Sequence, residues 1–510
     1  TVVQAGTTLP DRDYYLKDGE KETAAQAALV EYVDRIYGLL GDRTPDPGKT
    51  VLALEKRLAE IQWPRVELRD ASKTYNKFAI DQFAAKTPTL RWPAFLEASG
   101  TPGIAEINVA TPSYFEALAA LFEKVDVPTW KTWLRFKLLD AYAPYLAPAF
   151  DEAHFDFHGR KIAGIQEQLP RWKRSVEAIS GRGAGDFGAL GDVLGKLYVE
   201  QHFTPQSKSR MDELVRNLLA AFGTSIDELS WMTPATKAKA RDKLARITTK
   251  IGYPTKWRSY AGLEVRPDDL VGNVMRSRRY EHERNAAKLG QPVDRDEWGM
   301  TPQTVNAYYN PSLNEIVFPA AILQPPFFSV DAPDALNYGG IGGVIGHEIS
   351  HAFDDQGSRY DGAGNLVNWW TDADRAAFEA LTKRLVAQYS TYEPLPGRRV
   401  KGDFTLGENI ADLSGLAVAY KAYQLAKQGK EPQQLEGWTG NQLFFVGWSR
   451  VWQRKYREAE LVKRLLTDPH SPSQYRANGP VMNLDAFHDA FGVKEGDALW
   501  KPPAERIRIW

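Results

Sequence analysis

The chain has 510 residues, with 64 Lys and Arg against 65 Asp and Glu, a formal net charge of −1 and no cysteine. This length predicts two or more lobes, because single cores rarely grow beyond about 250–300 residues. The balanced charge argues against a nucleic-acid partner, which would favour a basic surplus. Without cysteine there is no disulfide and no thiol nucleophile, so a metal site would need His, Asp and Glu. No run of 18 apolar residues occurs, and the sequence therefore predicts no membrane span.

The first half of the chain shows helical periodicity. Apolar residues recur at helical spacing over Leu29–Leu40, and Gly41 follows as a stop. The same pattern over Met211–Phe222 predicts a helix that ends at Gly223. Thr233-Pro234 is typical of an N-cap followed by Pro at the first helical position. Strand signals are sparse before residue 250, so we expect a helical lobe over residues 1–269.

The pattern changes towards residue 270, and we expect a second lobe over residues 270–510. Two short strands are predicted in it, over Val305–Tyr309 and Glu315–Phe318, separated by turn residues. A glycine run over Gly339–Gly346 follows, and it lacks the order of a phosphate-binding loop. We expect its small residues to allow close helix packing.

The strongest chemical signal is the H-E-x-x-H motif of His347, Glu348 and His351. Residues four apart on a helix lie on one face, so both imidazoles can reach one ion. Glu348 would then project towards a water molecule on that ion. The composition predicts only about 0.016 such matches by chance. His154 and His158 are also four apart, but Phe155 stands where the acidic residue would be, and we interpret this second pair as structural.

A catalytic zinc needs a third protein ligand and an open position. The metzincin pattern would require Gly and His at positions that hold Asp354 and Gly357, and an aminopeptidase pattern would require Glu where Trp370 stands. A more distant helical acid fits better. Glu408 and Asp412 lie four apart, so Glu408 can bind the metal while Asp412 accepts a ring N–H from a ligand histidine.

Several stretches together resemble the neprilysin family of zinc peptidases, family M13. The resemblance rests on the H-E-x-x-H helix with its flanks, on the acidic motif around Glu408, and on His470-Ser471-Pro472 followed by Arg476. It also includes the terminal Trp510 and a weaker similarity over Leu9–Leu16. The remaining stretches are Val305–Pro311 and Ile316–Phe328. The matches occur in the family's order along nearly the whole chain.

The resemblance implies an α+β, predominantly helical fold, with a thermolysin-like (gluzincin) catalytic lobe and an all-helical capping lobe. It implies one zinc ion per chain, with His347, His351 and Glu408 as ligands and Asp412 in contact with a ligand histidine. Asp354 lies on the same arc as the two histidines, and we interpret it as a residue that contacts them or packs the helix. Glu348 would be the general base and His470 would stabilise the oxyanion. Further residues would bind the peptide: Asn306 and Ala307 along an edge strand, Arg476 at a carbonyl, and Ile322, Phe327, Phe328, Val344 and Trp452 around an apolar side chain.

The expected activity is zinc-dependent endopeptidase cleavage of peptides on the amino side of hydrophobic residues. Two alternatives remain open: a catalytically silent peptide-binding or scaffold protein on the same fold, and another metal hydrolase such as an aminopeptidase. Retention of Glu348 argues against the first, because a binding module needs no general base. The residue count to Trp370 argues against the second.

The resemblance has one departure, because family members carry a substantial stretch upstream of the segment that resembles Leu9–Leu16. We expect this stretch to have been cleaved, to form a separate N-terminal fragment, or to be missing. The family's human members are disulfide-rich ectodomains, whereas this chain has no cysteine and looks like a bacterial relative. The expected location is extracytoplasmic, periplasmic or secreted, with the cytoplasm as the alternative.

Overall fold

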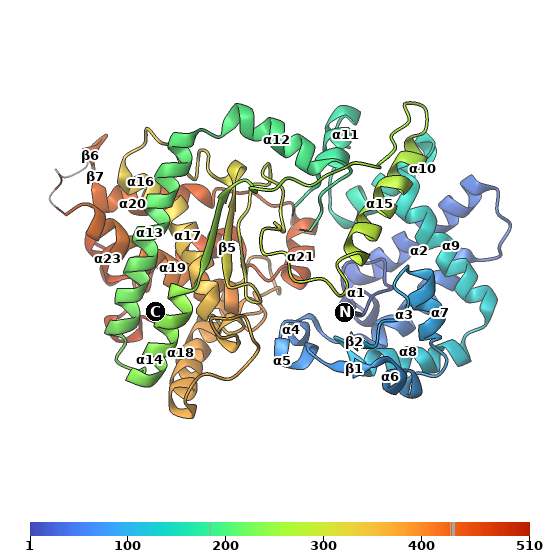
Figure 1. Ribbon diagram of the computed structural model, residues 1–510, viewed down its shortest axis with the longest axis horizontal. Coiled ribbons are helices and arrows are strands. Elements are labelled where there is room, and N and C mark those ends of the chain that lie inside the picture. The colour runs from blue at the N-terminus through green and yellow to red at the C-terminus, as the bar shows by residue number, and fades with distance from the viewer. Residues whose placement is uncertain (184, 429, 431–433) are drawn as a thin grey trace. The chain divides into compact units, whose positions relative to one another are not determined.

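The computed structural model describes residues 1–183, 185–428, 430 and 434–510 (Figure 1). By their internal contacts these residues form two compact units. Unit 1 comprises Thr1–Pro170, Ala261–Val293 and Tyr456–Asp468, and unit 2 comprises Arg171–Tyr260, Asp294–Lys455 and Pro469–Trp510. Both units are discontinuous in sequence, and the single lobe boundary near residue 270 stays a prediction.

Unit 1 is built mainly from helices around an apolar core. Helices α2, α3 and α9 contact one another and carry much of this core (Figure 1). A two-stranded antiparallel sheet pairs β1 (Lys77–Ala79) with β2 (Glu106–Asn108). The helices are α1 (Asp13–Leu16), α2 (Glu20–Leu40), α3 (Pro47–Ile61), α4 (Arg65–Leu68), α5 (Ala71–Thr74), α6 (Ile80–Lys86), α7 (Trp92–Ala98), α8 (Pro112–Lys124), α9 (Val127–Tyr142), η1 (Ala143–Tyr145), α10 (Pro148–His154), the π-helix η2 (Phe155–Ile162), α15 (Leu270–Ala286) and α21 (Glu458–Thr467).

Helix α2 forms where the apolar periodicity predicted it. Its buried face includes Leu29, Val33 and Ile36, which follow the helical repeat. The helix ends at Gly41, whose φ of 72° lies in the left-handed region that favours glycine. The predicted stop is therefore confirmed at this position.

Unit 2 combines a larger set of helices with short strands. Helices α13, α17 and α19 contact one another (Figure 1). The helices are α11 (Arg171–Ser180), α12 (Gly191–His202), α13 (Pro205–Glu228), α14 (Pro234–Ala245), η3 (Ala320–Ile322), α16 (Asp334–Gly339), α17 (Ile341–Ser350), η4 (His351–Phe353), η5 (Gly357–Arg359), α18 (Asp372–Ser390), α19 (Leu406–Ala426), α20 (Gly440–Val451), α22 (Ser473–Val481), α23 (Asp485–Phe491) and η6 (Pro503–Glu505). The strands are β3 (Thr248–Gly252), β4 (Tyr308–Asn310), β5 (Glu315–Pro319), β6 (Gln434–Leu435) and β7 (Trp438–Thr439).

A three-stranded sheet of order β3-β5-β4 lies in unit 2. The fully buried β5 is central, parallel to β3 and antiparallel to β4, with Tyr309 opposite Ile316. Strand β3 was not predicted, and β4 begins at Tyr308 rather than at the predicted Val305. Burial of β5 on both sides explains its unbroken apolar stretch Ile316–Phe318.

Helix α13 does not stop at Gly223, where the sequence predicts an end. It continues to Glu228, because Gly223 is in the helix interior where its missing side chain makes room for a neighbour. A Cβ at this position would lie 2.6 Å from Nη1 of Arg241 on α14. The glycine therefore lies beside a neighbouring side chain and does not end the helix.

The glycine run before the H-E-x-x-H motif packs closely against two other helices, as expected. A Cβ on Gly343 would lie 2.7 Å from the ring of Trp448 on α20. A Cβ on Gly346 would lie 2.3 Å from the carbonyl oxygen of Gly415 on α19. Helices α17 and α19 therefore cross backbone against backbone, which only glycine permits at these positions.

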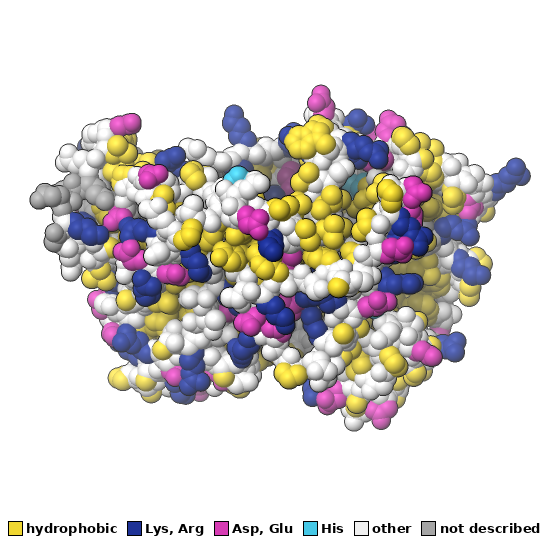
Figure 2. Space-filling view, turned by 45° about the horizontal axis from the view of Figure 1, so that its top comes forward, with side chains coloured by type: hydrophobic (Ala, Val, Ile, Leu, Met, Phe, Trp, Pro, Cys, Tyr) yellow, Lys and Arg dark blue, Asp and Glu magenta, His cyan; other side chains and the backbone are white. Residues whose placement is uncertain are grey.

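Charged side chains of both signs are interspersed over the face seen in Figure 2, in keeping with the nearly balanced charge of the chain. Within the described residues, no helix combines the length and the apolarity needed to cross a bilayer.

Candidate metal centre

The H-E-x-x-H motif ends helix α17, every residue of which is buried. His347 lies in the last turn, and His351 begins the following segment η4. The two imidazole rings lie 4.5 Å apart between centroids, and their Nε2 atoms approach to 2.9 Å. Both histidines therefore direct a ring nitrogen at the same point.

Glu408 brings a third donor atom from the first turn of α19. Its Oε2 lies 3.2 Å from Nε2 of His347 and 3.5 Å from Nε2 of His351. Zinc bonds of about 2.0–2.1 Å in a tetrahedral site separate two donors by about 3.3 Å, which is close to these distances. The buried Oε2 accepts no hydrogen bond of acceptable geometry from any residue that the structure describes. The three side chains form a group that fits a zinc ion.

Carboxylates contact the outer nitrogens of both histidines. Nδ1 of His347 lies 2.8 Å from Oδ1 of Asp412, and Nδ1 of His351 lies 2.7 Å from Oδ2 of Asp354. Such contacts fix the tautomer and the orientation of an imidazole, leaving Nε2 directed at the metal. Asp354 also accepts hydrogen bonds from the backbone N–H groups of Gln356 and Gly357, which hold its carboxylate in place.

Arg476 completes the contacts of Asp412. Its Nε and Nη2 donate to the two carboxylate oxygens of Asp412 over 2.7 and 2.8 Å. Its guanidinium also lies 4.0 Å from the ring centroid of Trp452. The series of contacts that begins at His347 on α17 therefore extends through Asp412 on α19 to Arg476 on α22.

Burial and neighbouring charges push the pKa values of the two glutamates in opposite directions. Burial raises the pKa of Glu348 above its ordinary value, and the nearby histidines offset only part of this. Burial also raises the pKa of Glu408, but His470 and His351 lower it by more, to well below its ordinary value. Glu408 is therefore suited to be an ionised ligand and Glu348 to exchange a proton.

His470 lies beside the same group but is more exposed. Its Nε2 is 3.0 Å from Oε2 of Glu408, and its side chain is 41% exposed. This position leaves the imidazole open to solvent and to a bound molecule next to the donors.

The residues expected to bind the substrate backbone lie just before β4. Asn306 is exposed and Ala307 is buried, and neither is inside the strand, which begins at Tyr308. Strand β4 pairs only with β5 among the described residues, so it is an edge strand. The expected edge is present, but the two residues precede it instead of forming part of it.

The apolar residues expected around a substrate side chain lie in η3, in the loop that follows it, in α17 and just after α20. Ile322, Phe328 and Val344 are buried, and Phe327 and Trp452 are half-buried. The carbonyl of Phe327 accepts a hydrogen bond of 2.8 Å from the N–H of Ile341, which ties this loop to the start of α17. Trp452 packs edge-on against Trp448, the ring that contacts Gly343.

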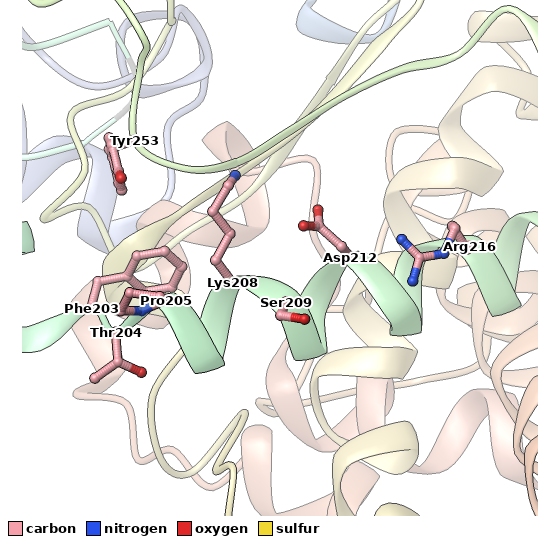
Figure 3. Close-up of a pocket in the computed structure, with 8 residues that line it drawn as sticks. All are labelled: Phe203, Thr204, Pro205, Lys208, Ser209, Asp212, Arg216 and Tyr253. Atoms are coloured by element: carbon pink, nitrogen blue, oxygen red, sulfur yellow. The ribbon is translucent and has the colours of Figure 1, made fainter.

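Two cavities in unit 2 contain none of the expected site residues. One, of about 350 Å³, lies at the start of α13, where Lys208 projects from the helix between Tyr253 and Asp212 (Figure 3). The other, of about 440 Å³, lies between α19 and the last residues of the chain, and Ser414 and Trp510 line it. Neither cavity coincides with the metal group.

Two features near the metal group were not identified from the sequence. Gly415 allows the crossing of α19 with α17. It lies three residues after Asp412, and no motif in the sequence indicates that a helix crosses there. Lys243 donates to the carbonyls of Gly357 and Tyr360, both at 2.7 Å, in the segment after His351. Burial lowers the pKa of Lys243 to about 7. A lysine in a polar helical stretch gives no indication of such a long-range contact.

The chain resembles known zinc peptidases over its whole length. Two family models, both of peptidase family M13, match residues 1–254 and 306–507. Endothelin-converting enzyme 1 from Mus musculus is 35% identical over 533 residues, covering all of this chain and 67% of that enzyme. The Homo sapiens enzyme is likewise 35% identical, with the same coverage. The chain thus spans about two thirds of the length of these relatives.

The solved structures agree with the sequence matches. An inhibitor complex of the Mycobacterium tuberculosis zinc metalloprotease Zmp1 is 48% identical with a TM-score of 0.95, covering 100% of this chain and 77% of that one. PepO from Lactobacillus rhamnosis is 31% identical with a TM-score of 0.87, covering 100% and 79%. Since family models, curated relatives and structures coincide, and the donor group fits zinc, the chain belongs to peptidase family M13 and is a zinc metalloendopeptidase.

Proposed function

We propose that His347, His351 and Glu408 hold the single catalytic zinc ion and that Glu348 is the general base for peptide-bond hydrolysis. The observation that carries this proposal is the convergence of three donor atoms, because the buried Oε2 of Glu408 lies 3.2 Å from Nε2 of His347 and 3.5 Å from Nε2 of His351. When bound, zinc supplies a Lewis acid that polarises the scissile carbonyl and makes water acidic enough to attack near neutral pH.

Glu348 moves the protons in this proposal. Its carboxylate takes a proton from the attacking water and delivers it to the nitrogen of the leaving amine. A pKa raised by burial supports this role, because an acid with a pKa nearer to neutrality can both accept and release the proton.

His470 would stabilise the oxyanion that forms as water adds to the carbonyl. Its partial exposure and its 3.0 Å approach to Glu408 support this role, since the ring can face both solvent and the reacting carbonyl. Asp412 and Asp354 would orient the ligand histidines. Arg476 would hold Asp412 and direct part of its guanidinium at a substrate carbonyl.

Replacing Glu348 by Gln tests the division of roles. The variant should keep a full equivalent of zinc and its affinity for peptide, while kcat falls by several orders of magnitude, because the amide cannot accept the proton. Glu379→Gln is the matched control, since Glu379 is exposed on α18 and distant in sequence from the motif. Loss of zinc from Glu348→Gln would contradict the assignment of Glu348 as a base and make it a ligand.

We further propose that the enzyme prefers a hydrophobic residue just after the scissile bond. Ile322, Phe327, Phe328, Val344 and Trp452 would surround this side chain, and Asn306 and Ala307 would bind the peptide backbone beside β4. Val344 lies one helical turn before His347, which supports a slot next to the metal group. Burying a Leu or Phe side chain there would contribute roughly 1.5–3 kcal/mol.

A mixed peptide library tests this preference. Cleavage should occur before Phe and Leu, and rarely before Asp or Lys, whose charge would be buried without a partner. Val344→Phe should narrow the slot and move the preference to smaller residues such as Ala. Frequent cleavage of the wild type before charged residues would contradict the assignment of the slot and leave the zinc ligands unaffected.

The lobes and the location of the enzyme complete the proposal. We expect a helical capping lobe over residues 1–269 and a thermolysin-like catalytic lobe over 270–510, supported by the family resemblance. The same resemblance supports an extracytoplasmic location. Fractionation of source cells tests this expectation, and enzyme recovered only from the cytoplasm would contradict it.

A further inference from the structure

A second group of metal-binding side chains lies in unit 1, where the metalloendopeptidase activity assigns no function. We propose that Asp140, His154 and His158 bind a second divalent transition-metal ion, for which Zn²⁺ is the probe. Among the residues that the structure describes, only this group and the one around His347 bring three such donors together. In each, the potential ligand atoms lie within 4.8 Å of one another.

The histidine pair in this group has nearly the same spacing as the pair in the catalytic group. The ring centroids of His154 and His158 lie 4.4 Å apart, compared with 4.5 Å for His347 and His351. Both pairs are four residues apart in sequence and come with one carboxylate from another helix. Two imidazoles and one carboxylate form a donor set that suits Zn²⁺ and its neighbours in the first transition series.

The backbone under this pair is unusual. His154 ends α10, and His158 is in the π-helix Phe155–Ile162 that continues it. Stretches of π-helix are rare in proteins and occur frequently at functional sites. Here the π-helix joins α10 directly, so the two imidazoles straddle the junction. The π-helix is an observation independent of the donor set, and it also indicates a functional site at this histidine pair.

Asp140 is held in position as a carboxylate by its surroundings. The hydroxyl of Tyr32 on α2 donates to Oδ1 of Asp140 over 2.8 Å, and the ring of Tyr32 stacks on Phe157 at 4.7 Å. Nε2 of His158 lies 2.7 Å from the same oxygen. A tyrosine that orients a carboxylate in this way is a common outer contact of metal ligands.

The group is also accessible to an ion. The side chains of His158 and Asp140 are 32% and 16% exposed, which leaves an entry path and room for water at the remaining coordination positions. His158 is more exposed than either catalytic histidine, since the exposures are 7% for His347 and 17% for His351. We therefore expect the second ion to exchange faster and bind more weakly than the catalytic one.

The competing interpretation is a hydrogen-bonded cluster that needs no metal. Nε2 of His158 lies 2.7 Å from Oδ1 of Asp140, closer than the separation of about 3.3 Å between two zinc ligands. The catalytic group shows a similar contraction, with 2.9 Å between two Nε2 atoms. A short donor–donor distance therefore does not distinguish a cluster from a metal site, and binding has to be measured.

The test titrates the metal-stripped 510-residue chain with Zn²⁺ and counts bound equivalents by isothermal calorimetry and elemental analysis. Wild type should bind two equivalents. His351→Ala should bind one, now at the second group, and lose peptidase activity. His154→Ala should also bind one but keep peptidase activity. A single equivalent on the wild type, or none on His351→Ala, overturns the proposal without affecting the catalytic assignment.

Two further variants identify the ligands. Asp140→Asn keeps an acceptor for Tyr32 but loses the charge, so it should raise the Kd of the second ion at least tenfold and leave the first unchanged. His282→Ala is the matched control, because His282 is an exposed histidine of unit 1 outside the group. In the His351→Ala background, Co²⁺ should give d–d absorption bands that disappear with His158→Gln. A second equivalent that persists in both His154→Ala and His158→Gln is adventitious binding and overturns the proposal.

Discussion

His347 is linked by two successive charged contacts to the interior of unit 2. Asp412 lies 2.8 Å from its Nδ1, and Arg476 binds both oxygens of Asp412. Asp412 has no exposed surface, and these two partners contact both of its carboxylate oxygens. At the scale of single residues, the orientation of an imidazole thus depends on a carboxylate that an arginine holds in place.

Replacing Asp412 by Ala should weaken zinc binding about 10–100-fold without eliminating it. The physical reason is that His347 loses the contact that fixes its tautomer, while Nε2 still faces Glu408. Zinc affinity is measured by competition with a chromogenic chelator. Asp403→Ala, at an exposed aspartate before α19, serves as the control and should leave the affinity unchanged. Equal affinities for Asp412→Ala and wild type would contradict the expectation.

Asp374 is a second buried carboxylate with several donors. It accepts hydrogen bonds from the hydroxyls of Thr233, Thr236 and Thr371 and from the N–H of Thr233. Burial raises its pKa, but these hydrogen bonds lower it by more, to about 2. A carboxyl with a depressed native pKa stabilises the fold above its unfolded value of about 3.9, and this contribution is lost as pH falls towards 2.

Asp374→Asn should therefore lower the free energy of unfolding at pH 5 by about 2–3 kcal/mol. The difference between variant and wild type should shrink between pH 4 and pH 2, where the wild-type carboxylate becomes protonated. Urea unfolding at each pH measures the free energy of unfolding of both proteins. A chelator is added so that both are metal-free and a pH-dependent loss of metal does not contribute to the difference. A difference that stays constant from pH 5 to pH 2 would show that the charge of Asp374 contributes nothing.

At the scale of elements, the crossing of α17 and α19 positions the metal group. The two helices meet at Gly346 and Gly415, next to His347 on one side and close to Asp412 and Glu408 on the other. A Cβ on Gly415 would lie 2.3 Å from the backbone nitrogen of His347. The separation of the two helices therefore sets the distance between Glu408 and the two histidines.

Gly415→Ala should separate the helices and reduce both zinc affinity and kcat/KM at least tenfold. Overpacking of this kind costs about 1–3 kcal/mol, and here the nearest atoms are backbone and cannot rotate away. Gly38→Ala is the control, because Gly38 lies in α2 and a Cβ there would meet no described atom within 4 Å. That change should be neutral or stabilise the protein by about 0.5–1 kcal/mol. Wild-type zinc affinity in Gly415→Ala would contradict the importance of the close crossing.

At the scale of the whole molecule, the last residue of the chain contributes to the core of unit 2. The ring of Trp510 lies within 6.2 Å of those of Phe222, Trp231, Phe353, Trp370 and Phe378. Its Nε1 donates to the carbonyl of Phe353, two residues after His351, over 3.2 Å. Residues far apart in sequence therefore support the segment that carries the second histidine.

Trp510→Ala should lower the free energy of unfolding by about 3–5 kcal/mol, the usual cost of removing a buried aromatic side chain. Thermal unfolding followed by tryptophan fluorescence and circular dichroism measures the change. Trp510→Phe should recover part of the loss, since it restores ring contacts without the hydrogen bond. Trp172→Ala, at an exposed tryptophan of unit 2, should be close to wild type. Equal stability of the Trp510→Ala and Trp172→Ala variants would contradict the role of the cluster.

Much of the fold and of the candidate site could be predicted from local patterns. Helical periodicity predicted α2 and its end at Gly41, and the family resemblance and the predominantly helical fold are confirmed by the comparisons. The end predicted at Gly223 was wrong, because a glycine that stops a helix and one that accommodates a neighbour look the same in sequence. Strand β3 was missed, since its burial depends on pairing with the distant β5.

The sequence by itself determined the family, from its motifs and their order, and the donor types. It also determined that His347 and His351 share one face, because contacts four residues apart are set by helix geometry alone. The tertiary structure decided which distant residues complete each group. It brings Glu408 to His347 through the crossing at Gly346 and Gly415. It also brings Asp140 to a histidine pair that the sequence indicated to be only structural. Contacts between such distant residues depend on how whole elements pack against one another, and local sequence patterns do not predict that packing.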